Sequence, residues 1–193
     1  MAFLRSVTSF DTGPVLYGDQ VVLRIPQMSD FSAWADLRAV SRNFLVPWEP
    51  TWPADDLTRA SFRRRIRRYQ RDVHEGLTYP FFVYLRDDDV LVGGLTLSNI
   101  RRGVAQCCSV GYWIGEPYQR CGLMSDAVRT VLPFAFDVLN LHRVEAACLP
   151  TNQASINLLR GCQFTEEGFA RRYLKINGVW QDHLLFAVVA GDI

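Results

Sequence analysis

The sequence predicts a single α+β domain built around a mixed β-sheet. Short apolar segments with strand character alternate along the chain with longer segments in which apolar residues recur every three or four positions, the period of an amphipathic helix. Near the C-terminus, Asn177-Gly178 separates two strand-like segments, which is typical of a β-hairpin. The 193 residues contain no internal repeat and no linker-like stretch, so we expect one domain over residues 1–193.

Local patterns define the elements in order. Apolar and alternating runs predict seven strands, at 18–25, 80–85, 90–99, 106–114, 142–149, 165–176 and 180–189. The helical period predicts helices at 29–40, 59–74, 124–139 and 152–161. Ser29 is a candidate N-cap for the first helix, and Pro133 is expected to kink the third. A loop rich in proline and tryptophan lies at 43–53.

Composition indicates a globular protein without a dominant charge. Hydrophobic residues make up 49% of the chain and charged residues 21%, and the formal net charge is +1. No apolar run is long enough to span a membrane, and residues 1–10 lack the pattern of a signal peptide. The five cysteines, an odd number without metal-type spacing, are most simply reduced thiols. We therefore expect a soluble cytoplasmic protein with no membrane partner and no metal.

The segment from Val110 to Val138 carries the most specific signal. A strand at 110–114 leads through a polar turn into residues 119–124, which read QRCGLM, and then into a long amphipathic helix. The first N–H groups of a helix have no internal partners and lie at the positive end of its dipole, so they attract anions. Gly122 lets the backbone approach a ligand closely, and Arg120 adds a fixed positive charge. The segment predicts a phosphate or pyrophosphate site, with an ordinary turn as the alternative.

Two blocks, YQRCGLM before a helix and PTNQASINLL after a strand, resemble the GNAT superfamily of acetyl-CoA-dependent N-acetyltransferases. Gln119, Arg120, Gly122 and Leu123 match the phosphate loop of that family, whereas Met124 replaces its last small residue. The segments SRNFLVPWEP, GYWIG, LHRVEAACLPTN and YLKINGVWQDH extend the resemblance, over about residues 18–190, to the ribosomal-protein-alanine acetyltransferases of the RimJ type.

The resemblance implies a mixed, mostly antiparallel seven-stranded sheet flanked by helices. Its two central parallel strands, 106–114 and 142–149, would splay apart and admit the pantetheine arm of acetyl-CoA as a form of strand addition. Arg120 and the backbone N–H groups after it would bind the pyrophosphate. Asn152 is a helix N-cap and would also hold the arm. The residues implied in cofactor binding are Trp113, Ile114, Gln119, Arg120, Cys121, Gly122, Leu123, Met124, Ser125 and Asn152.

The reaction that the resemblance implies is direct attack of an amine on the thioester, without a covalent enzyme intermediate. The departing thiolate needs a hydrogen-bond donor, and the position of the late-helix tyrosine of many GNAT enzymes is occupied here by Leu159. Ser155 is the hydroxyl that we expect to serve, with an ordinary first-turn serine as the alternative. Glu145 and Glu116 are the candidate bases, with structural salt bridges as the alternative for both. His183 is more simply a structural hydrogen-bonding residue.

The acceptor end is expected to form from the 43–53 loop and the hairpin at Gly178. Trp48 and Tyr112 would pack against the acceptor and Glu49 would attract its ammonium group, with a packed loop and a core aromatic as the alternatives. The helix segment Arg59–Arg71 holds seven of the 20 arginines; it would dock on rRNA or an acidic partner, or is simply a solvated face. Both a monomer and a homodimer fit the sequence.

Three functions are compatible with these features. The resemblance favours acetylation of the N-terminal α-amino group of a ribosomal protein that begins with Ala, Ser or Thr. The second function is acetylation of a small-molecule amine, because acceptor specificity lies in loops. The third is a non-catalytic ribosome-assembly or RNA-binding factor that retains the acetyl-CoA fold. The missing late-helix tyrosine and the arginine cluster favour this third function.

Overall fold

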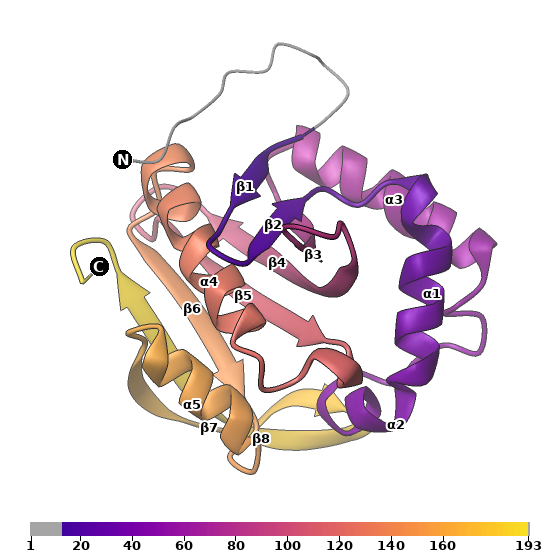
Figure 1. Cartoon of the computed structure of the whole chain (residues 1–193). Coiled ribbons are helices and arrows are strands. Elements are labelled where there is room, and N and C mark those ends of the chain that lie inside the picture. The colour runs from indigo at the N-terminus through magenta and orange to yellow at the C-terminus, as the bar shows by residue number, and fades with distance from the viewer. Residues whose placement is uncertain (1–12, 193) are drawn as a thin grey trace.

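The computed structural model describes residues 13–192 and shows a mixed sheet covered by helices (Figure 1). Residues 1–12 and 193 of the predicted domain lie outside the described residues. The strands are β1 (Val15–Tyr17), β2 (Val21–Arg24), β3 (Tyr79–Leu85), β4 (Leu91–Arg101), β5 (Cys107–Ile114), β6 (Arg143–Cys148), β7 (Thr165–Ile176) and β8 (Val179–Val189). Their order is β1-β2-β3-β4-β5-β6-β8-β7, and only β5 and β6 pair in parallel within this sheet of residues 15–189. The predicted mixed, mostly antiparallel α+β fold is confirmed.

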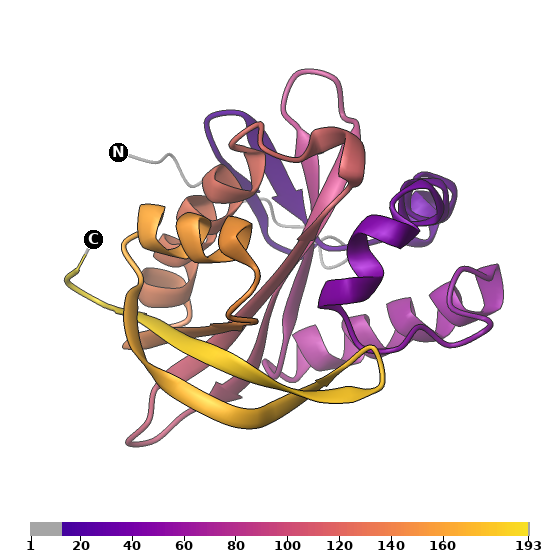
Figure 2. The ribbon, with the colours of Figure 1, turned by 90° about the horizontal axis from the view of Figure 1, so that it is seen from below.

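Helices lie on both faces of the sheet. The α-helices are α1 (Phe31–Val40), α2 (Arg42–Leu45), α3 (Arg59–His74), α4 (Leu123–Pro133) and α5 (Gln153–Gly161). Figure 2 shows α1 and α3 on one side of the central strands and α4 and α5 on the other. None of the helices between residues 13 and 192 has the length and apolar character that crossing a membrane requires.

Each helical layer buries its own apolar cluster. On one face, α4 and α5 cover a core that extends from Leu23 in β2 to Phe186 in β8. On the other face, Trp34 of α1 and Phe62 of α3 pack together, with ring centroids 4.8 Å apart, against β3 and β4. The parallel pair β5–β6 therefore lies under the α4–α5 layer, where the phosphate loop was predicted.

Residues 13–192 contain eight strands rather than the predicted seven, because the structure adds β1. This strand has only three residues, two of them exposed, so alternation gives little signal for it. Long-range contacts support it instead: Asp126, buried in α4, accepts a hydrogen bond at 2.8 Å from the N–H of Gln20 in the turn between β1 and β2.

Two helix ends also differ from the prediction. Ser29 does not cap α1, because it lies inside a 3-10 turn, η1 (Met28–Asp30), in which the Asp30 carboxylate accepts a hydrogen bond from Gln27 N–H at 2.7 Å. The predicted loop at 43–53 begins with helical turns, α2 and η2 (Val46–Trp48).

Pro133 ends α4, and the chain continues as a π-helix, η4 (Phe134–Val138). Proline has no N–H to donate and its ring crowds the preceding turn, which explains the change of helix type.

The parallel strands β5 and β6 pair only at one end. Their register joins Cys107 to Arg143, Cys108 to Val144 and Ser109 to Glu145. Both strands continue, β5 to Ile114 and β6 to Cys148, but they have separated. Among the described residues, the edge of β5 that faces β6 has no strand partner after Ser109. We call the paired part the closed end and the separated part the open end.

Candidate active site

The open end leaves a gap near the middle of the sheet. Gly111 lies in this part of β5 and pairs with Thr96 of β4 on its other edge, yet it is exposed. A side chain added at Gly111 would meet no atom within 4 Å. A central strand normally has a hydrogen-bonded neighbour along both edges. Because β5 has no strand partner on its β6 side after Ser109 in the described chain, an extended ligand could pair with the β5 backbone there.

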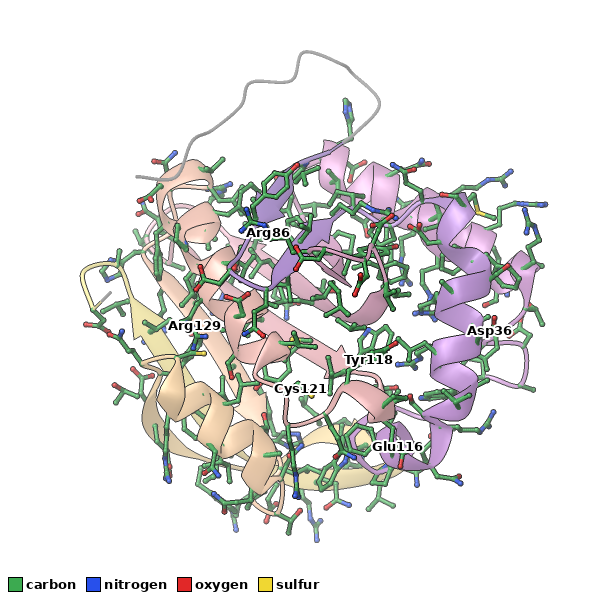
Figure 3. The ribbon with its side chains drawn as sticks, in the orientation of Figure 1. Asp36, Arg86, Glu116, Tyr118, Cys121 and Arg129 are labelled. Carbon is green, nitrogen blue, oxygen red and sulfur yellow. The ribbon has the colours of Figure 1, made fainter. Side chains whose placement is uncertain are left out.

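The predicted phosphate loop lies beside this gap, between β5 and α4. Gly122 is the N-cap of α4 and has φ 78°, and Arg120 also has a positive φ of 60°. The first α-helical hydrogen bond runs from Asp126 N–H to Gly122 C=O at 3.0 Å, so the N–H groups of residues 123–125 precede it. Residues 119–122 are all exposed, and nothing lies within 4 Å of a side chain built at Gly122. Figure 3 shows Tyr118 and Cys121 along this segment. The loop is shaped to receive an anion.

Met124 departs from the small residue of the family pattern without blocking the loop. Its side chain is only 6% exposed and points into the core, where its Cε lies 3.2 Å from the position of a Cβ built at Gly93. The adjacent Leu123 is also buried. Since both side chains turn inward, their backbone N–H groups remain at the start of α4. A side chain at position 93 would first meet the backbone oxygen of Trp113, at 2.4 Å, so the glycine is required by the close approach of β5.

A pair of hydroxyl groups lies at the open end. Tyr112 of β5 and Ser155 of α5 share a hydrogen bond of 2.8 Å between their side-chain oxygens. Asn152 is the N-cap of α5, and its side-chain oxygen accepts a hydrogen bond from Ser155 N–H at 3.1 Å. Burial raises the pKa of Tyr112 above its ordinary value, and the hydrogen bond with Ser155 opposes that shift. Tyr112 is therefore a neutral hydrogen-bonding group near pH 7.

The thiol nearest this pair is not an activated nucleophile. Cys148 ends β6 and is 6% exposed. Burial raises the pKa of Cys148, against a smaller opposing effect of a hydrogen bond with Ser155. All five cysteines are free, and four of them are buried. Cys121, in the phosphate loop, is the exposed one. Beside the hydroxyl pair, the structure thus places a buried thiol rather than a reactive thiolate.

The two candidate carboxylates lie in different surroundings. Glu145 faces Ser109 at the last pair of the closed end, and its oxygens are 2.9 Å from the guanidinium groups of Arg101 and Arg143. The structure does not bring Glu145 to Ser155. Glu116 is exposed at the start of the turn η3 (Glu116–Tyr118), directly after β5, and forms no ion pair within residues 13–192. Figure 3 shows it beside α2.

A groove of about 620 Å³ lies beyond the end of β6. Its lining comes from the turn η2, the segment that joins β6 to α5, and the two strands of the C-terminal hairpin: Pro47, Trp48, Leu149, Pro150, Thr151, Arg172, Trp180, Gln181 and Asp182. The predicted acceptor residue Trp48 is among them. Asn152 follows Thr151 directly, so the groove adjoins the start of α5.

Glu49 is used inside the protein rather than in this groove. Its two carboxylate oxygens each accept a hydrogen bond at 2.7 Å from Arg38, and one also accepts from Trp52 Nε1 at 2.7 Å. Arg38 is buried, and its guanidinium lies 4.0 Å from the ring centroid of Trp52. The backbone of Glu49 accepts a hydrogen bond from Asn177 N–H at 2.8 Å. Glu49 therefore ties the 43–53 loop to α1 and to the hairpin.

Sequence reasoning missed several of these residues. Arg38 lies four positions after Trp34 and so shares the buried face of α1; that spacing was a usable signal. Trp180 and Arg172 reach the groove only because the hairpin β7–β8 is long, which no local pattern reveals. His183, by contrast, is buried, and its Nδ1 lies 3.0 Å from the carbonyl oxygen of Gln181. This agrees with the expectation that His183 is a structural hydrogen-bonding residue. Leu159 is fully buried and offers no proton.

Comparisons with known proteins identify the family. A family model described as "Acetyltransferase (GNAT) domain" matches residues 20–165. The [ribosomal protein uS5]-alanine N-acetyltransferase of Escherichia coli is 32% identical over 90% of this chain and 90% of its own length. Crystallised ribosomal-protein-S5-alanine acetyltransferase from Vibrio fischeri superposes with a TM-score of 0.86 at 30% identity, covering 93% of this chain and 98% of the other.

A second solved structure contains a form of coenzyme A. RimJ of Mycobacterium smegmatis, in complex with CoA-disulfide, has a TM-score of 0.86 at 32% identity and covers 94% of this chain and 88% of its own. The family match, the open end of β5–β6 and the exposed loop before α4 agree with one another. The chain belongs to the GNAT acetyltransferases, and its close relatives are of the RimJ type, so it is an acetyl-CoA-dependent N-acetyltransferase.

Proposed function

We propose that this enzyme acetylates the N-terminal α-amino group of a ribosomal protein that begins with Ala, Ser or Thr. The observation that carries the proposal is the groove that reaches Thr151, the residue before Asn152, and has two tryptophans in its lining. Such a groove suits the end of a polypeptide, whose first side chain would pack on Trp48 and Trp180. The relatives named for ribosomal-protein-alanine acetylation support the same acceptor. Since ribosomal proteins are its proposed substrates, we propose that the enzyme works in the cytoplasm.

The acetyl donor has a matching set of groups in this chain. The open edge of β5 near Trp113 and Ile114 would pair with the pantetheine amides. The loop of Gln119, Arg120, Cys121 and Gly122, with the N–H groups of residues 123–125, would bind the pyrophosphate. The amide of Asn152 still has its donor group, because its recorded hydrogen bond uses only the oxygen. We propose that this donor holds the arm.

In the proposed reaction a neutral amine attacks the thioester carbon. The new C–N bond forms, the C–S bond breaks, the nitrogen loses one proton and the sulfur gains one. Ser155 is the proposed hydrogen-bond donor to the departing sulfur, and Tyr112 would hold it in place through the 2.8 Å hydrogen bond. The proton that the sulfur gains is the one that the nitrogen loses, passed on by the base or by water. The raised pKa of Tyr112 suits this positioning role, because a hydroxyl that keeps its proton can donate a hydrogen bond to Ser155 while Ser155 donates to the sulfur.

Removal of the proton from the amine needs only a weak base. An α-amino group has an ordinary pKa of about 8, so deprotonation near pH 7 is a small barrier. Of the two candidate carboxylates, Glu116 has no ion-pair partner in the described chain, whereas both Glu145 oxygens are engaged by arginines. We therefore propose Glu116 ahead of Glu145, acting directly or through water.

The test is release of the CoA thiol in the presence of defined acceptors. Short peptides that begin with Ala, Ser, Thr or Met would be compared with the same peptides blocked at the N-terminus and with a panel of small amines. We expect release with the free Ala, Ser and Thr peptides alone. Release only with small amines would assign a metabolite acceptor, and acetyl-CoA binding without release from peptides or ribosomal particles would favour the non-catalytic role.

A further inference from the structure

The helix α3 is the positive pole of this molecule. Seven arginines and one aspartate in Arg59–His74 give it a formal charge of +6, so the remaining residues carry −5 in a chain of net charge +1. Phe62 and Ile66 bury one face of the helix against α1 and the sheet. The arginines other than the half-buried Arg65 are exposed and lie on the outward face. We call this outward set, Arg59, Arg63, Arg64, Arg67, Arg68 and Arg71, the arginine face.

The arginine face does not help the helix to form. The first turn of α3 contains no acidic residue, and Arg59 occupies its first position, where the helix dipole disfavours positive charge. Arg59, Arg63, Arg67 and Arg71 follow one another at four-residue intervals, so like charges repel along the surface. A local arrangement that weakens its own element indicates that the residues serve another purpose.

Most of the charge on this face is not neutralised within the protein. Arg64 pairs with Asp55 and Arg71 with Asp72. Within residues 13–192, Arg59, Arg63, Arg67 and Arg68 form no ion pair. The guanidinium groups of Arg59 and Arg68 lie over the rings of Phe31 and Tyr69. The face therefore presents several unpaired guanidinium groups to solvent.

The chemistry of the face selects phosphate over a protein surface. A four-residue interval on an α-helix is about 6 Å, which is of the same order as the distance between neighbouring phosphates of a nucleic-acid strand. Guanidinium groups bind phosphate oxygens in a bidentate manner. No large apolar side chain is exposed between Phe62 and Val73, whereas protein interfaces normally have an aromatic or aliphatic centre.

We propose that the arginine face binds the sugar-phosphate backbone of RNA and holds the enzyme on a ribosomal particle. The choice of RNA rests on the proposed ribosomal substrate. The other observations do not depend on that substrate. They are the charges of α3, the spacing of those charges, and the arginines of α3 that have no ion-pair partner in the described chain.

The experiment measures binding of a fluorescent rRNA hairpin between about 50 and 200 mM salt, without acetyl donor or acceptor. The variant R63Q/R67Q removes two charges that have no ion-pair partner. The control R86Q/R129Q removes the same charge from exposed arginines elsewhere (Figure 3). We expect the slope of log affinity against log salt to fall in magnitude by about 2 in R63Q/R67Q and to stay unchanged in the control. A DNA hairpin of the same sequence should bind less tightly, because RNA adds 2′-hydroxyl groups.

Several results would overturn the proposal. One is a slope of log affinity against log salt near zero for the wild type, and another is an equal fall of that slope in the control R86Q/R129Q. Equal binding of the DNA hairpin would also overturn it. Displacement of RNA by a polyglutamate chain of matched charge would assign an acidic protein as the partner instead. A second measurement uses the intact enzyme: R63Q/R67Q should raise KM for a ribosomal particle several-fold while KM for a short peptide stays the same. Failure of the wild type to acetylate both short peptides and ribosomal particles would refute the proposed function and leave the RNA result standing.

Discussion

The two ends of the β5–β6 pair have the same strands but opposite chemistry. At the closed end, Glu145 lies between Arg101 and Arg143, and Arg143 also pairs with Glu167, whose pKa it lowers. At the open end, the contact across the strands and α5 is between two neutral hydroxyl groups, Tyr112 and Ser155. Where the two strands pair, the charged side chains form ion pairs with one another. Where the strands separate, the side chains in contact are hydroxyl groups that can donate and accept hydrogen bonds.

This difference separates structural from chemical roles among residues of similar type. A glutamate and a serine can be compared on each side: Glu145 and Ser109 pair at the closed end, whereas Ser155 contacts the open end and Glu116 lies in the turn that follows β5. Glu145 therefore serves as a control for Glu116, and Ser109 for Ser155. The assignment of different roles would be wrong if substitution of Glu145 or Ser109 lowered turnover more than substitution of its counterpart.

The largest effect is expected from Gly122→Glu, beside the open end. The new side chain carries a negative charge into the phosphate loop. Residue 122 has a φ of 78°, a left-handed backbone conformation that is unfavourable for glutamate. Loss of two or more charge-assisted hydrogen bonds, each worth about 1.5–3 kcal/mol, should weaken acetyl-CoA binding by about 100-fold or more. Isothermal titration calorimetry measures it. Gly122→Asn is the matched control, because asparagine tolerates positive φ; equal affinity of the glutamate variant and wild type would refute the loop assignment.

Ser155→Ala should lower kcat by about 100-fold with little change in KM for acetyl-CoA, because the departing sulfur loses its hydrogen-bond donor. Tyr112→Phe should lower kcat by no more than about tenfold, and the double variant should lose less than the product of the two, since both act along one hydrogen bond. Steady-state kinetics provide the test. Ser109→Ala, at the closed end, is the control, and a comparable loss there would remove the distinction between the ends.

Exchange of the two glutamates for glutamine should separate stability from turnover. Glu145→Gln is expected to lower the free energy of unfolding by no more than about 1 kcal/mol, because its ion pairs are partly exposed, and to leave kcat near that of wild type. Glu116→Gln should lower kcat by about tenfold or more without loss of stability. Urea unfolding and initial rates measure the two quantities. The reverse pattern would make Glu145 the base.

The smallest effect concerns alkaline stability. Because the pKa of Tyr112 is raised on folding, the folded protein holds its proton above about pH 10, where the unfolded chain releases it. Its contribution to stability is therefore complete below that pH and declines above it. Tyr112→Phe should make the melting temperature fall less steeply above pH 10 than in wild type. Identical profiles would show that the hydroxyl is not desolvated at the open end.

The features that sequence predicted well are those fixed by local backbone geometry. Gly122 at the start of α4, Asn152 at the start of α5 and the Asn177-Gly178 turn each need a particular residue at a particular position. The boundaries of α3 also follow from its own periodicity and from Thr58, whose hydroxyl caps it. These signals extend over a few residues and can be read without knowing the fold.

The rest depends on contacts between distant segments. Tyr112 and Ser155 are 43 positions apart, and their contact exists only because β5 and α5 meet at the gap. Glu49 was expected to face the acceptor, but the buried guanidinium of Arg38 holds its carboxylate. Local pattern identifies a candidate carboxylate or hydroxyl, whereas its partner is decided by packing.

The open edge of β5 has a consequence for solubility. Unpaired strand edges are the usual templates for β-aggregation, and proteins normally protect them with charge, proline or a short edge strand. This edge lies inside the sheet, beside β6 and beneath α4 and α5, rather than at the border of the molecule. A flat strand from another protein would have to enter between these elements with its side chains on both faces. The fold can therefore keep backbone hydrogen-bonding groups available for a slender ligand while hiding them from other β-sheets.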